Sequence, residues 1–462
     1  MNKIVVAVII VILAVAGVAF ASVFKDLPKE NPEPEAIEIS TLEELKAMKS
    51  GNRYVLTSDI SMVGENASLP YAKLNGNGHS ITGFTKPLFQ YNVSLENIKL
   101  QGSASGIKVG LLSANGGSVH LNNVQVTGEL TTSGVDPCGG IAPFMYGSIK
   151  GSTIDIKITG KAPAAEIAGT CSFIEFENTN IRGSVQSERH ASGIVYMIGT
   201  KDSGGSLTFK DTVLSTVTDS AGSASGIAKT TETKNLRLEG LTFKDCVIRG
   251  TQEVGIIFSQ LNLKLSLGSF IFENAKVEGE QYVGGLFGKV KKVMLEDISN
   301  DEGLTVIGLK TAYKDAYIGG ITGYSNWTVK KCSNYARVDN QGSGNYTGGI
   351  IGYLESPFLL DSINKGKVTS KGDNVGGIAG CVFADTATSS GLMGDINYAD
   401  VSGKKGVGGL FGFITRTRLI PDVVVSSCVN LGNISGMSSV AQIVGDDSYS
   451  KLRNCSEEGS VS

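Results

Sequence analysis

The sequence has little proline, histidine and tryptophan. Only 10 of its 462 residues are proline, and Pro28, Pro32 and Pro34 lie close together near the N-terminus. Proline lacks the N–H that a β-ladder needs, so a chain with so little of it elsewhere favours paired strands. The 60 glycines therefore indicate an ordered, β-rich body and not a glycine-rich disordered tract.

The sequence also lacks a charge bias. Lysine and arginine (41) nearly balance aspartate and glutamate (44), and no basic stripe with interleaved aromatics is present. We therefore expect no nucleic-acid partner. No two of the three histidines, His79, His120 and His190, lie close together in sequence, and no His-Glu-x-x-His motif occurs. The sequence thus predicts no metal site of the His-Glu-x-x-His kind and no cofactor.

Long apolar runs are absent except at residues 4–24, which carry no charge and follow Lys3. This run fits either a cleaved secretory signal or an uncleaved membrane anchor, so residues 1–24 are predicted to be one of the two. Both predict an extracellular location, secreted or at the cell surface. Residues 25–38, rich in proline and glutamate, are predicted to be an extended linker.

A short glycine motif recurs along the chain. "VGGLFG" at 283–288 returns at 407–412, with "IGGITG" at 318, "TGGIIG" at 347 and "VGGIAG" at 375. The residue before the glycine pair, or its degenerate counterpart, marks twelve copies about 30 residues apart: Val109, Cys138, Ile167, Ala191, Ala224, Val254, Val283, Ile318, Thr347, Val375, Val407 and Val440.

A second motif keeps the same period, as in "CSNYARV" at 332 and "SINKGKV" at 362. Its alternate positions match from copy to copy, and a period of two is typical of a strand. One column holds asparagines, which we expect to stack as a hydrogen-bonded structural ladder that fixes the register: Asn334, Asn364, Asn397 and Asn430.

Short strands, glycine turns and this period predict an all-β fold, a parallel β-helix or β-solenoid of about twelve coils. The glycines are expected to give positive φ and close approach at corners, with a buried aliphatic residue between them. "STLEELKAMKS" (40–50) predicts a short N-terminal helix that caps the first coil. Residues 39–108 would form this cap and the first coils, and residues 109–462 the regular repeats.

The glycine corners, the asparagine strands and the runs "YVLTSDISM" and "LNGNGHSITGF" resemble bacterial and archaeal surface proteins built from GLUG-motif repeats. The resemblance covers about residues 39–462. It implies an extracellular, adhesin-like β-helical rod, which in that family is sometimes attached to a surface peptidase. The peptidase motif is missing here.

Seven cysteines leave at least one thiol unpaired. Cys332, Cys428 and Cys455 share one column, and Cys246 is expected to join it. A Cys428–Cys455 disulfide on neighbouring coils is conceivable, but stacked free thiols are the preferred prediction.

No catalytic constellation stands out, so we predict no catalytic residue. Asp446 and Asp447 form one carboxylate pair, which fits a solvated turn better than a dyad. Seven aromatic residues crowd between Tyr313 and Tyr353 and include the only tryptophan. They favour a ligand platform at Tyr324, Trp327, Tyr346 and Tyr353, although a stack that only supports the coil remains an alternative.

The sequence therefore predicts a non-catalytic, adhesin-like surface protein whose solenoid binds a glycan or protein partner, with membrane anchoring possible through residues 4–24. Two alternatives remain open. One is a β-helical enzyme acting on polysaccharides, as a lyase or glycoside hydrolase, and the other is a purely structural stalk.

Overall fold

The computed structural model describes residues 35–199, 204–234, 236–311, 313–356, 358–384, 391–418, 421–446 and 449–462. Residues Glu38–Ser462 form one compact unit, and Met1–Ile37 are a separate one. The predicted signal or anchor at 1–24 and most of the predicted linker lie outside the described residues. Within the described residues, no helix has both the length and the apolar character of a membrane span.

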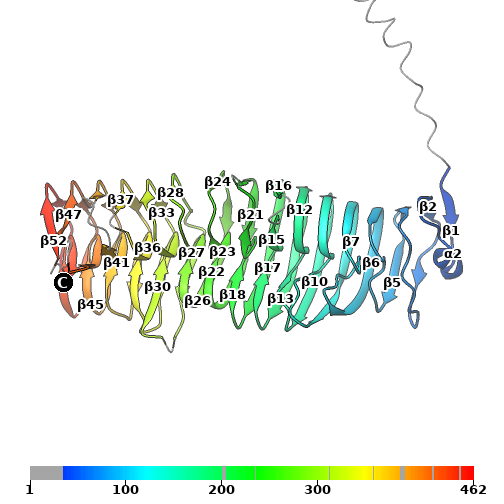
Figure 1. Ribbon diagram of the computed structural model, residues 1–462, viewed down its shortest axis with the longest axis horizontal. Coiled ribbons are helices and arrows are strands. Elements are labelled where there is room, and N and C mark those ends of the chain that lie inside the picture. The colour runs from blue at the N-terminus through cyan, green and yellow to red at the C-terminus, as the bar shows by residue number, and fades with distance from the viewer. Residues whose placement is uncertain are drawn as a thin grey trace, which may run out of the picture. The chain divides into compact units, whose positions relative to one another are not determined.

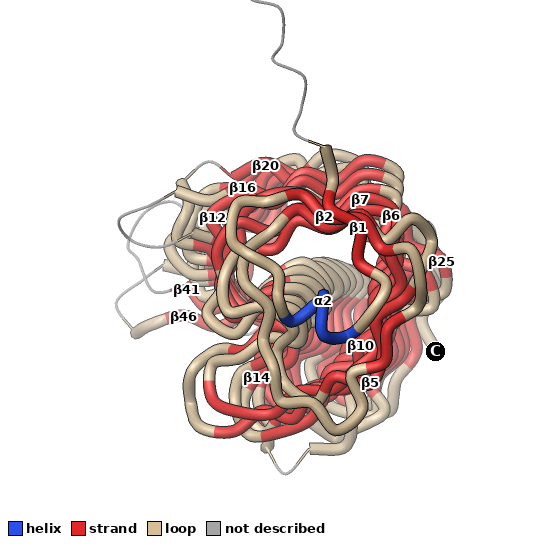
Figure 2. Tube along the Cα trace, turned by 90° about the vertical axis from the view of Figure 1, so that its right-hand side faces the viewer, coloured by secondary structure: helices blue, strands red, loops and turns tan. Residues whose placement is uncertain are grey.

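The Glu38–Ser462 unit is a parallel β-solenoid of about twelve turns, which confirms the predicted fold class. Its coils follow one another along a single axis (Figure 1). Viewed along that axis, the strands outline a closed coil around an interior (Figure 2). Each coil bonds to the coil before and after it through parallel pairs, so sequence-distant segments meet one repeat apart.

The largest sheet has 33 strands and runs through the whole unit. Its strands are β1 (Ile37–Ile39), β2 (Arg53–Leu56), β3 (Ile60–Ser61), β4 (Lys73–Asn75), β5 (Ser80–Phe84), β6 (Val93–Ile107), β7 (Gly117–Ser133), β8 (Cys138–Gly139), β9 (Ala142–Lys150), β10 (Thr153–Gly160), β11 (Ala164–Ala165), β12 (Ala168–Glu177), β13 (Asn180–Ser187), β14 (His190–Ser192), β15 (Val195–Ile198), β16 (Ser206–Lys210), β17 (Thr212–Ser220), β18 (Ser223–Ser225), β19 (Thr230–Thr231), β21 (Leu241–Lys244), β22 (Val247–Gly255), β25 (Ile271–Glu273), β26 (Ala275–Gly284), β29 (Leu304–Gly308), β30 (Asp315–Gly319), β34 (Arg337–Asn340), β35 (Asn345–Gly348), β39 (Val368–Ser370), β40 (Val375–Gly376), β44 (Val401–Ser402), β45 (Lys405–Gly408), β49 (Ile434–Ser435) and β50 (Ser438–Ala441).

Smaller sheets line the other faces of the later coils. A seven-stranded sheet contains β23 (Phe258–Leu261), β27 (Phe287–Val290), β31 (Thr322–Ser325), β36 (Ile351–Leu354), β41 (Ala379–Ala384), β46 (Phe411–Arg416) and β51 (Val444–Asp446). A six-stranded sheet contains β28 (Leu295–Glu296), β32 (Val329–Lys330), β37 (Phe358–Leu360), β42 (Gly391–Met393), β47 (Val423–Ser426) and β52 (Ser450–Arg453). A five-stranded sheet contains β33 (Ser333–Asn334), β38 (Ile363–Asn364), β43 (Ile396–Asn397), β48 (Val429–Asn430) and β53 (Ser456–Glu457), and a two-stranded sheet pairs β20 (Leu236–Leu238) with β24 (Leu265–Leu267).

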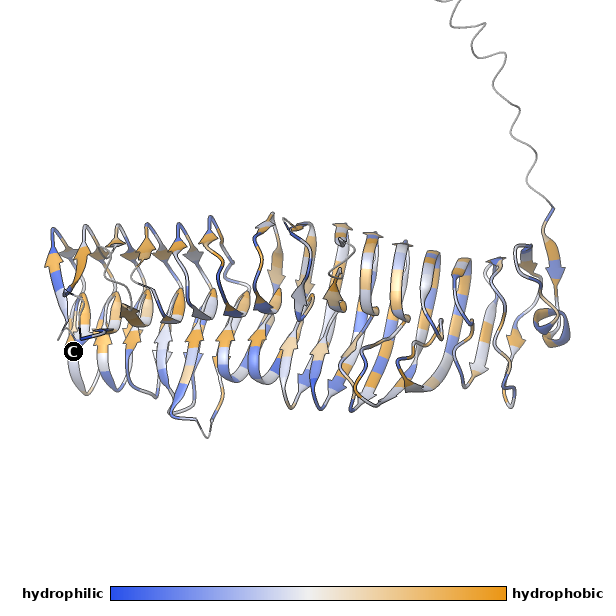
Figure 3. Ribbon diagram, viewed as in Figure 1, coloured by the Kyte–Doolittle hydropathy of each residue, from blue (hydrophilic) through white to orange (hydrophobic). Residues whose placement is uncertain are grey.

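Apolar side chains form continuous files inside the coils, because alternate residues of each strand point inward. The alternation shows as orange and blue bands along the strands (Figure 3). The aliphatic residues predicted at the corners are all buried: Leu286, Ile321, Ile350, Ile378 and Leu410. Burying one such side chain contributes roughly 1.5–3 kcal/mol before the entropy cost of ordering it.

The predicted repeat marks from Ala191 onward lie in one register. Ala191 pairs with Ala224, Ala224 with Val254 and Val254 with Val283, and the file continues to Val440. One mark was wrong. Ala164, and not Ile167, pairs with both Cys138 and Ala191. The degenerate "AAEIAG" stretch offers two small-residue starts, and only the backbone pairing distinguishes them.

The corner glycines are required for close approach and not for positive φ. At Gly320, Gly349, Gly377 and Gly409 the backbone does not adopt positive φ, which corrects the expectation from sequence. An added Cβ at Gly349 would lie 2.1 Å from the carbonyl oxygen of Gly377 and 2.4 Å from Cγ of Asn364. The second glycine of each corner therefore packs against the next coil and against the asparagine column.

The asparagine column is a buried hydrogen-bonded ladder. Nδ2 donates to Oδ1 of the next asparagine at 2.8 Å in each step from Asn334 through Asn364 and Asn397 to Asn430. The other Nδ2 hydrogen is donated to the backbone carbonyl two residues on, as from Asn364 to Gly366 at 2.9 Å. Each amide is thus satisfied in the interior, where an unpaired one would cost about 1–3 kcal/mol.

The ladder extends further at both ends than the sequence indicated. Asn300 donates to Asn334 at 2.8 Å, and Asn430 donates to Oε1 of Gln442. Glu457, which follows in the strand register, is exposed. Asn300 was missed because its neighbours "DISNDEG" do not match the motif.

Near the start of the unit, α2 (Leu42–Lys46) is a single helical turn and a little more. Thr41 caps it, since Thr41 Oγ1 accepts from the Glu44 backbone N–H and the Glu44 side chain accepts from the Thr41 backbone N–H. Leu45 and Met48 are buried against the core.

All seven cysteines are free thiols, and all except Cys455 are buried. Cys246 does not share the column of Cys332, which corrects that prediction. Val247 is in register with Lys276, Thr305 and Arg337, so Cys246 lies in the file of Ala336.

Candidate functional site

The most distinctive surface feature is a wall of five tyrosines, which we call the tyrosine patch. Tyr282, Tyr317 and Tyr346 stack in one file, with ring centroids 4.9 and 5.6 Å apart. Tyr324 and Tyr353 stack in a second file at 6.1 Å, as their matching phase predicted. The repeat places one residue of each file on the same coil, seven positions apart.

The two files meet at nearly right angles. The Tyr317 and Tyr353 rings cross at 80° with centroids 5.2 Å apart, and Tyr346 and Tyr353 cross at 76° and 5.4 Å. These are edge-to-face contacts, which suit the charge distribution of aromatic rings. Each of the five rings is half-buried, so ring edges face solvent while much of each face packs against a neighbour.

The first file lies at a corner where the backbone has positive φ. Tyr282, Tyr317 and Tyr346 have φ of 53°, 55° and 68°. The equivalent residues of the coils before and after have it too, so the conformation belongs to the repeat: Glu253, Asn374, Gly406 and Ser439. Asparagine and glycine adopt positive φ easily, whereas a bulky residue there costs roughly 1–2 kcal/mol.

Charged side chains border the patch. Lys289 Nζ lies 4.1 Å from the Tyr282 ring centroid and 5.3 Å from that of Tyr324, and it pairs with Glu253 at 3.8 Å. Burial lowers the pKa of Lys289, and Glu253 opposes that shift. The Tyr324 hydroxyl donates to the Glu355 carboxylate.

The phenol groups stay neutral at physiological pH. Burial raises the pKa of each of them, that of Tyr346 to about 12. Apart from Tyr324, no patch hydroxyl has a hydrogen-bond partner among the described residues. Four hydroxyls, those of Tyr282, Tyr317, Tyr346 and Tyr353, are therefore available to an external partner.

Three of the four predicted ligand-binding residues, Tyr324, Tyr346 and Tyr353, lie in the patch. Trp327 is exposed, but it makes no ring contact with the patch within the described part of the chain. Sequence reasoning missed Tyr282 and Lys289. The signal was present, because Tyr282 precedes its glycine mark as Tyr317 and Tyr346 do.

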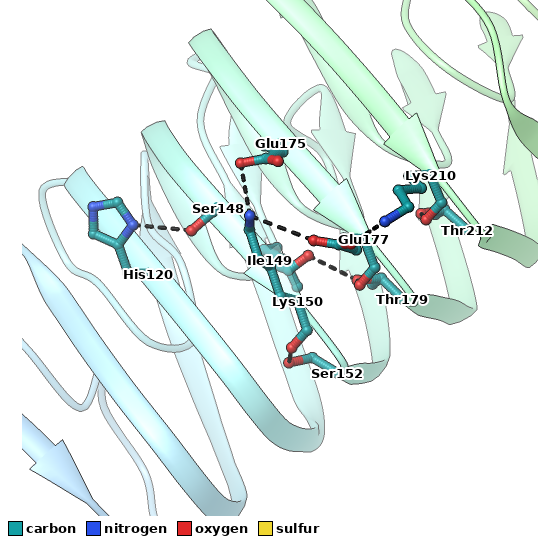
Figure 4. A network of polar contacts seen from close by, with 10 residues as sticks. All are labelled: His120, Ser148, Ile149, Lys150, Ser152, Glu175, Glu177, Thr179, Lys210 and Thr212. Carbon is teal, nitrogen blue, oxygen red and sulfur yellow. Dashed lines mark hydrogen bonds and ion pairs between the residues drawn. The ribbon is translucent and has the colours of Figure 1, made fainter. Parts of the chain in front are cut away.

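A second polar cluster lies on the outside of earlier coils (Figure 4). Lys150 Nζ pairs with Glu175 at 3.0 Å and Glu177 at 3.5 Å, and Lys210 pairs with Glu177 at 2.5 Å. The Lys210 hydrogen bond lowers the pKa of Glu177. The Glu177 carboxylate therefore stays ionised and paired with the two lysines, whereas a general acid must carry a proton.

Two buried carboxylates and one buried histidine lie inside the coils. Glu166 accepts from the Ile156 backbone N–H at 3.0 Å, and burial raises its pKa well above the usual range. Burial likewise raises the pKa of Asp395. His190, only 2% exposed, contacts Ser192 and Ser223 at 2.7 Å each, and burial keeps it neutral. These groups are sealed from solvent, so a substrate has no access to them.

Of the carboxylate pair Asp446–Asp447 noted in the sequence, Asp447 lies outside the described residues. In the described part of the chain, no group of three or more histidine, cysteine or acidic side chains is placed to hold a metal ion.

Comparisons with protein-family models, with curated proteins and with solved structures found no match to this chain.

Proposed function

We propose that this solenoid is a non-catalytic, adhesin-like binding rod of a secreted or cell-surface protein, and that the tyrosine patch receives its ligand. The observation that carries the proposal is the row of four phenol hydroxyls without a partner among the described residues, on rings held rigid by mutual stacking. Rigid aromatic rings offer a large contact at little entropic cost.

The run of tyrosines at one corner supports a role beyond folding. Positive φ recurs at this corner on every coil from Glu253 to Ser439, and only three successive coils place tyrosine there. Asn374 and Gly406, on later coils, adopt this conformation at less cost.

The charges nearby disfavour an acidic ligand. Glu253, Asp315 and Glu355 act electrostatically on the patch phenols, and Lys289 lies over the ring of Tyr282. An acidic ligand would meet net negative charge. We therefore propose an uncharged glycan as the ligand, whose hydroxyls can exchange hydrogen bonds with the phenols.

A glycan array with the compact unit from Glu38 onward tests this proposal. Tyr346→Asn introduces the residue that the next coil carries at this position, Asn374, so the variant should fold but lose glycan binding. Tyr324→Ala should lose glycan binding too. Tyr398→Ala removes an exposed tyrosine outside the patch and should bind as the parent does. Equal binding by all four proteins would reject the patch.

The same array separates the alternatives. Specific binding without product release favours the binding rod, whereas release of oligosaccharides would favour a polysaccharide-active enzyme. No binding to any glycan or protein partner would favour a structural stalk. Trp327→Ala shows whether the exposed ring beside β32 contributes.

The remaining features are proposed on sequence grounds. Residues 4–24 would act as a secretory signal or anchor, and the repeats would be of the GLUG kind. The α2 turn would cap the first coil, since it lies across the interior of the coil at that end (Figure 2), and Leu45 and the nearby Met48 are buried.

A further inference from the structure

One face of the solenoid carries the pair β20–β24 and the six-stranded sheet that begins with β28. Strand pairing on this face is interrupted between β24 and β28. β24 pairs only with β20 on the preceding coil, and β28 pairs only with β32 on the following coil. These two strands lie on successive coils, along the same side of the solenoid (Figure 1). Their coils remain joined on the other faces, by β23–β27 and β22–β26.

The interruption is not explained by the spacing between strands. Leu261 pairs with Val290, and β24 and β28 begin four and five residues further on. The next pair of coils has the same difference, since Val290 pairs with Ser325, yet β28 and β32 pair through Leu295 and Val329.

A cavity of about 510 Å³ lies between the two strands. Its walls are half-buried or buried aliphatic residues from both coils, including Leu263, Leu265, Leu267, Val293 and Leu295. Met294 also lines it and is 39% exposed. The volume is that of a ligand-sized pocket.

Backbone groups on both walls lack partners. The Gly268 N–H donates to the Leu238 carbonyl, so by strand alternation the N–H and C=O of Leu265 and Leu267 point away from β20. The Leu295 N–H donates to Thr328, so the N–H and C=O of Glu296 point away from β32. No backbone hydrogen bond joins residues 262–270 to 292–300, all of which the structure describes.

We infer that this cavity is a docking site for one extended strand of a partner protein, which adds in parallel between β24 and β28. Alternate residues of a parallel strand bond to opposite neighbours, so one strand can satisfy both walls. Its inward side chains would be aliphatic, to match Leu265 and Leu295.

Charge sets the direction and the ends of this strand. Lys264 and Lys292 lie where β24 and β28 begin, and Asp297 lies where β28 ends. A parallel strand would therefore carry an acidic residue at its N-terminal end and a basic one at its C-terminal end. The site uses no residue of the tyrosine patch and does not rest on the proposed function.

The test uses the full chain and a fluorescein-labelled peptide, Asp-Thr-Val-Thr-Val-Thr-Lys. We expect saturable binding by fluorescence anisotropy and slower hydrogen exchange in residues 262–268. The same peptide with both valine amides N-methylated cannot donate to β28 and should bind about tenfold more weakly or not at all.

Two matched variants locate the site. Met294→Trp fills the cavity and should weaken binding by about tenfold. Met393→Trp changes a similarly exposed methionine, 46% exposed, on β42 of the same sheet, whose two neighbours are both paired, and should not change binding. No binding, equal binding of the methylated peptide, or equal effects of the two variants would overturn the inference. So would self-association that Met294→Trp abolishes while the peptide does not bind, which would assign the cavity to a second copy.

Discussion

At the scale of single residues, the interior depends on polar groups that are fully paired. The asparagine ladder gives each amide two acceptors and one donor inside an apolar file. Removing one amide deprives its neighbours on both sides, because they have no access to water.

Asn364→Ala should therefore lower the stability of the solenoid by about 3 kcal/mol, since Asn334 Nδ2 and Asn397 Oδ1 both lose their partner. The urea unfolding midpoint by circular dichroism measures this. Asn66→Ala, at an exposed asparagine, is the control and should change little. A midpoint for Asn364→Ala equal to that of the control would contradict the ladder's contribution.

Glu166 should make stability depend on pH. Burial raises its folded pKa above the unfolded value of about 4.3, so the folded state keeps a proton that the unfolded state releases. The free energy of unfolding then falls as pH rises above that unfolded value, by up to about 1.4 kcal/mol per pH unit.

Glu166→Gln removes this proton and keeps the hydrogen bonds to Ile156 and Thr216. The stability of the variant relative to that of the parent should therefore increase as pH rises from 4 to 8. Urea unfolding midpoints of the two proteins at pH 4 and at pH 8 measure this difference. Glu302→Gln, at an exposed position, should track the parent. Parallel pH profiles for Glu166→Gln and the parent would show that Glu166 is not protonated in the folded state.

At the scale of the repeat, each corner combines a close backbone approach with a buried aliphatic residue. The glycine pair could be predicted from the sequence because its letters recur, and so could the aliphatic files. The reason for the glycines could not, since contact between Gly349 and Asn364 joins residues fifteen positions apart through the fold.

Gly349→Ala should destabilise the solenoid by at least about 2 kcal/mol, because its Cβ would overlap the Gly377 carbonyl and the Asn364 amide. Gly204→Ala, where nothing lies within 4 Å, should be neutral. Urea midpoints and resistance to limited proteolysis compare the two. Indistinguishable behaviour would mean that the corner has room for a side chain.

The positions of degenerate repeats were predicted less well. Ile167 was marked in place of Ala164 because small residues stand at both points, and Cys246 was placed two columns away from its actual file. The interruption between β24 and β28 could not be foreseen, because only the backbone pairing shows that these two strands bond to their outer neighbours and not to each other. The stacking of the tyrosines could be predicted from their matching positions in the repeat. The positive φ of Tyr282, Tyr317 and Tyr346 could not.

At the scale of the whole molecule, the solenoid encloses its thiols. Burial raises the pKa of Cys171, Cys246 and Cys332 to about 12, so these groups are neither ionised nor accessible at neutral pH.

A thiol reagent such as dithionitrobenzoate should therefore modify no more than about one cysteine per native chain, and Cys455→Ser should abolish that reaction. In denaturant, all seven should react in the parent. Rapid native modification of several thiols would contradict the packed interior. A parent chain with only five reactive thiols in denaturant would indicate a disulfide.

The asparagine ladder also has a direction. From Asn300 to Gln442 every amide donates toward the C-terminal side, so the bond dipoles add head to tail along the axis. One reversed amide would set Nδ2 against Nδ2 on one side and Oδ1 against Oδ1 on the other, and would break its own backbone bond as well. The file can therefore change orientation only as a whole, and aligned groups in a chain polarise one another in a low-dielectric interior. The core of these coils thus has an electrical polarity, with its negative end toward Asn300 and its positive end toward Gln442.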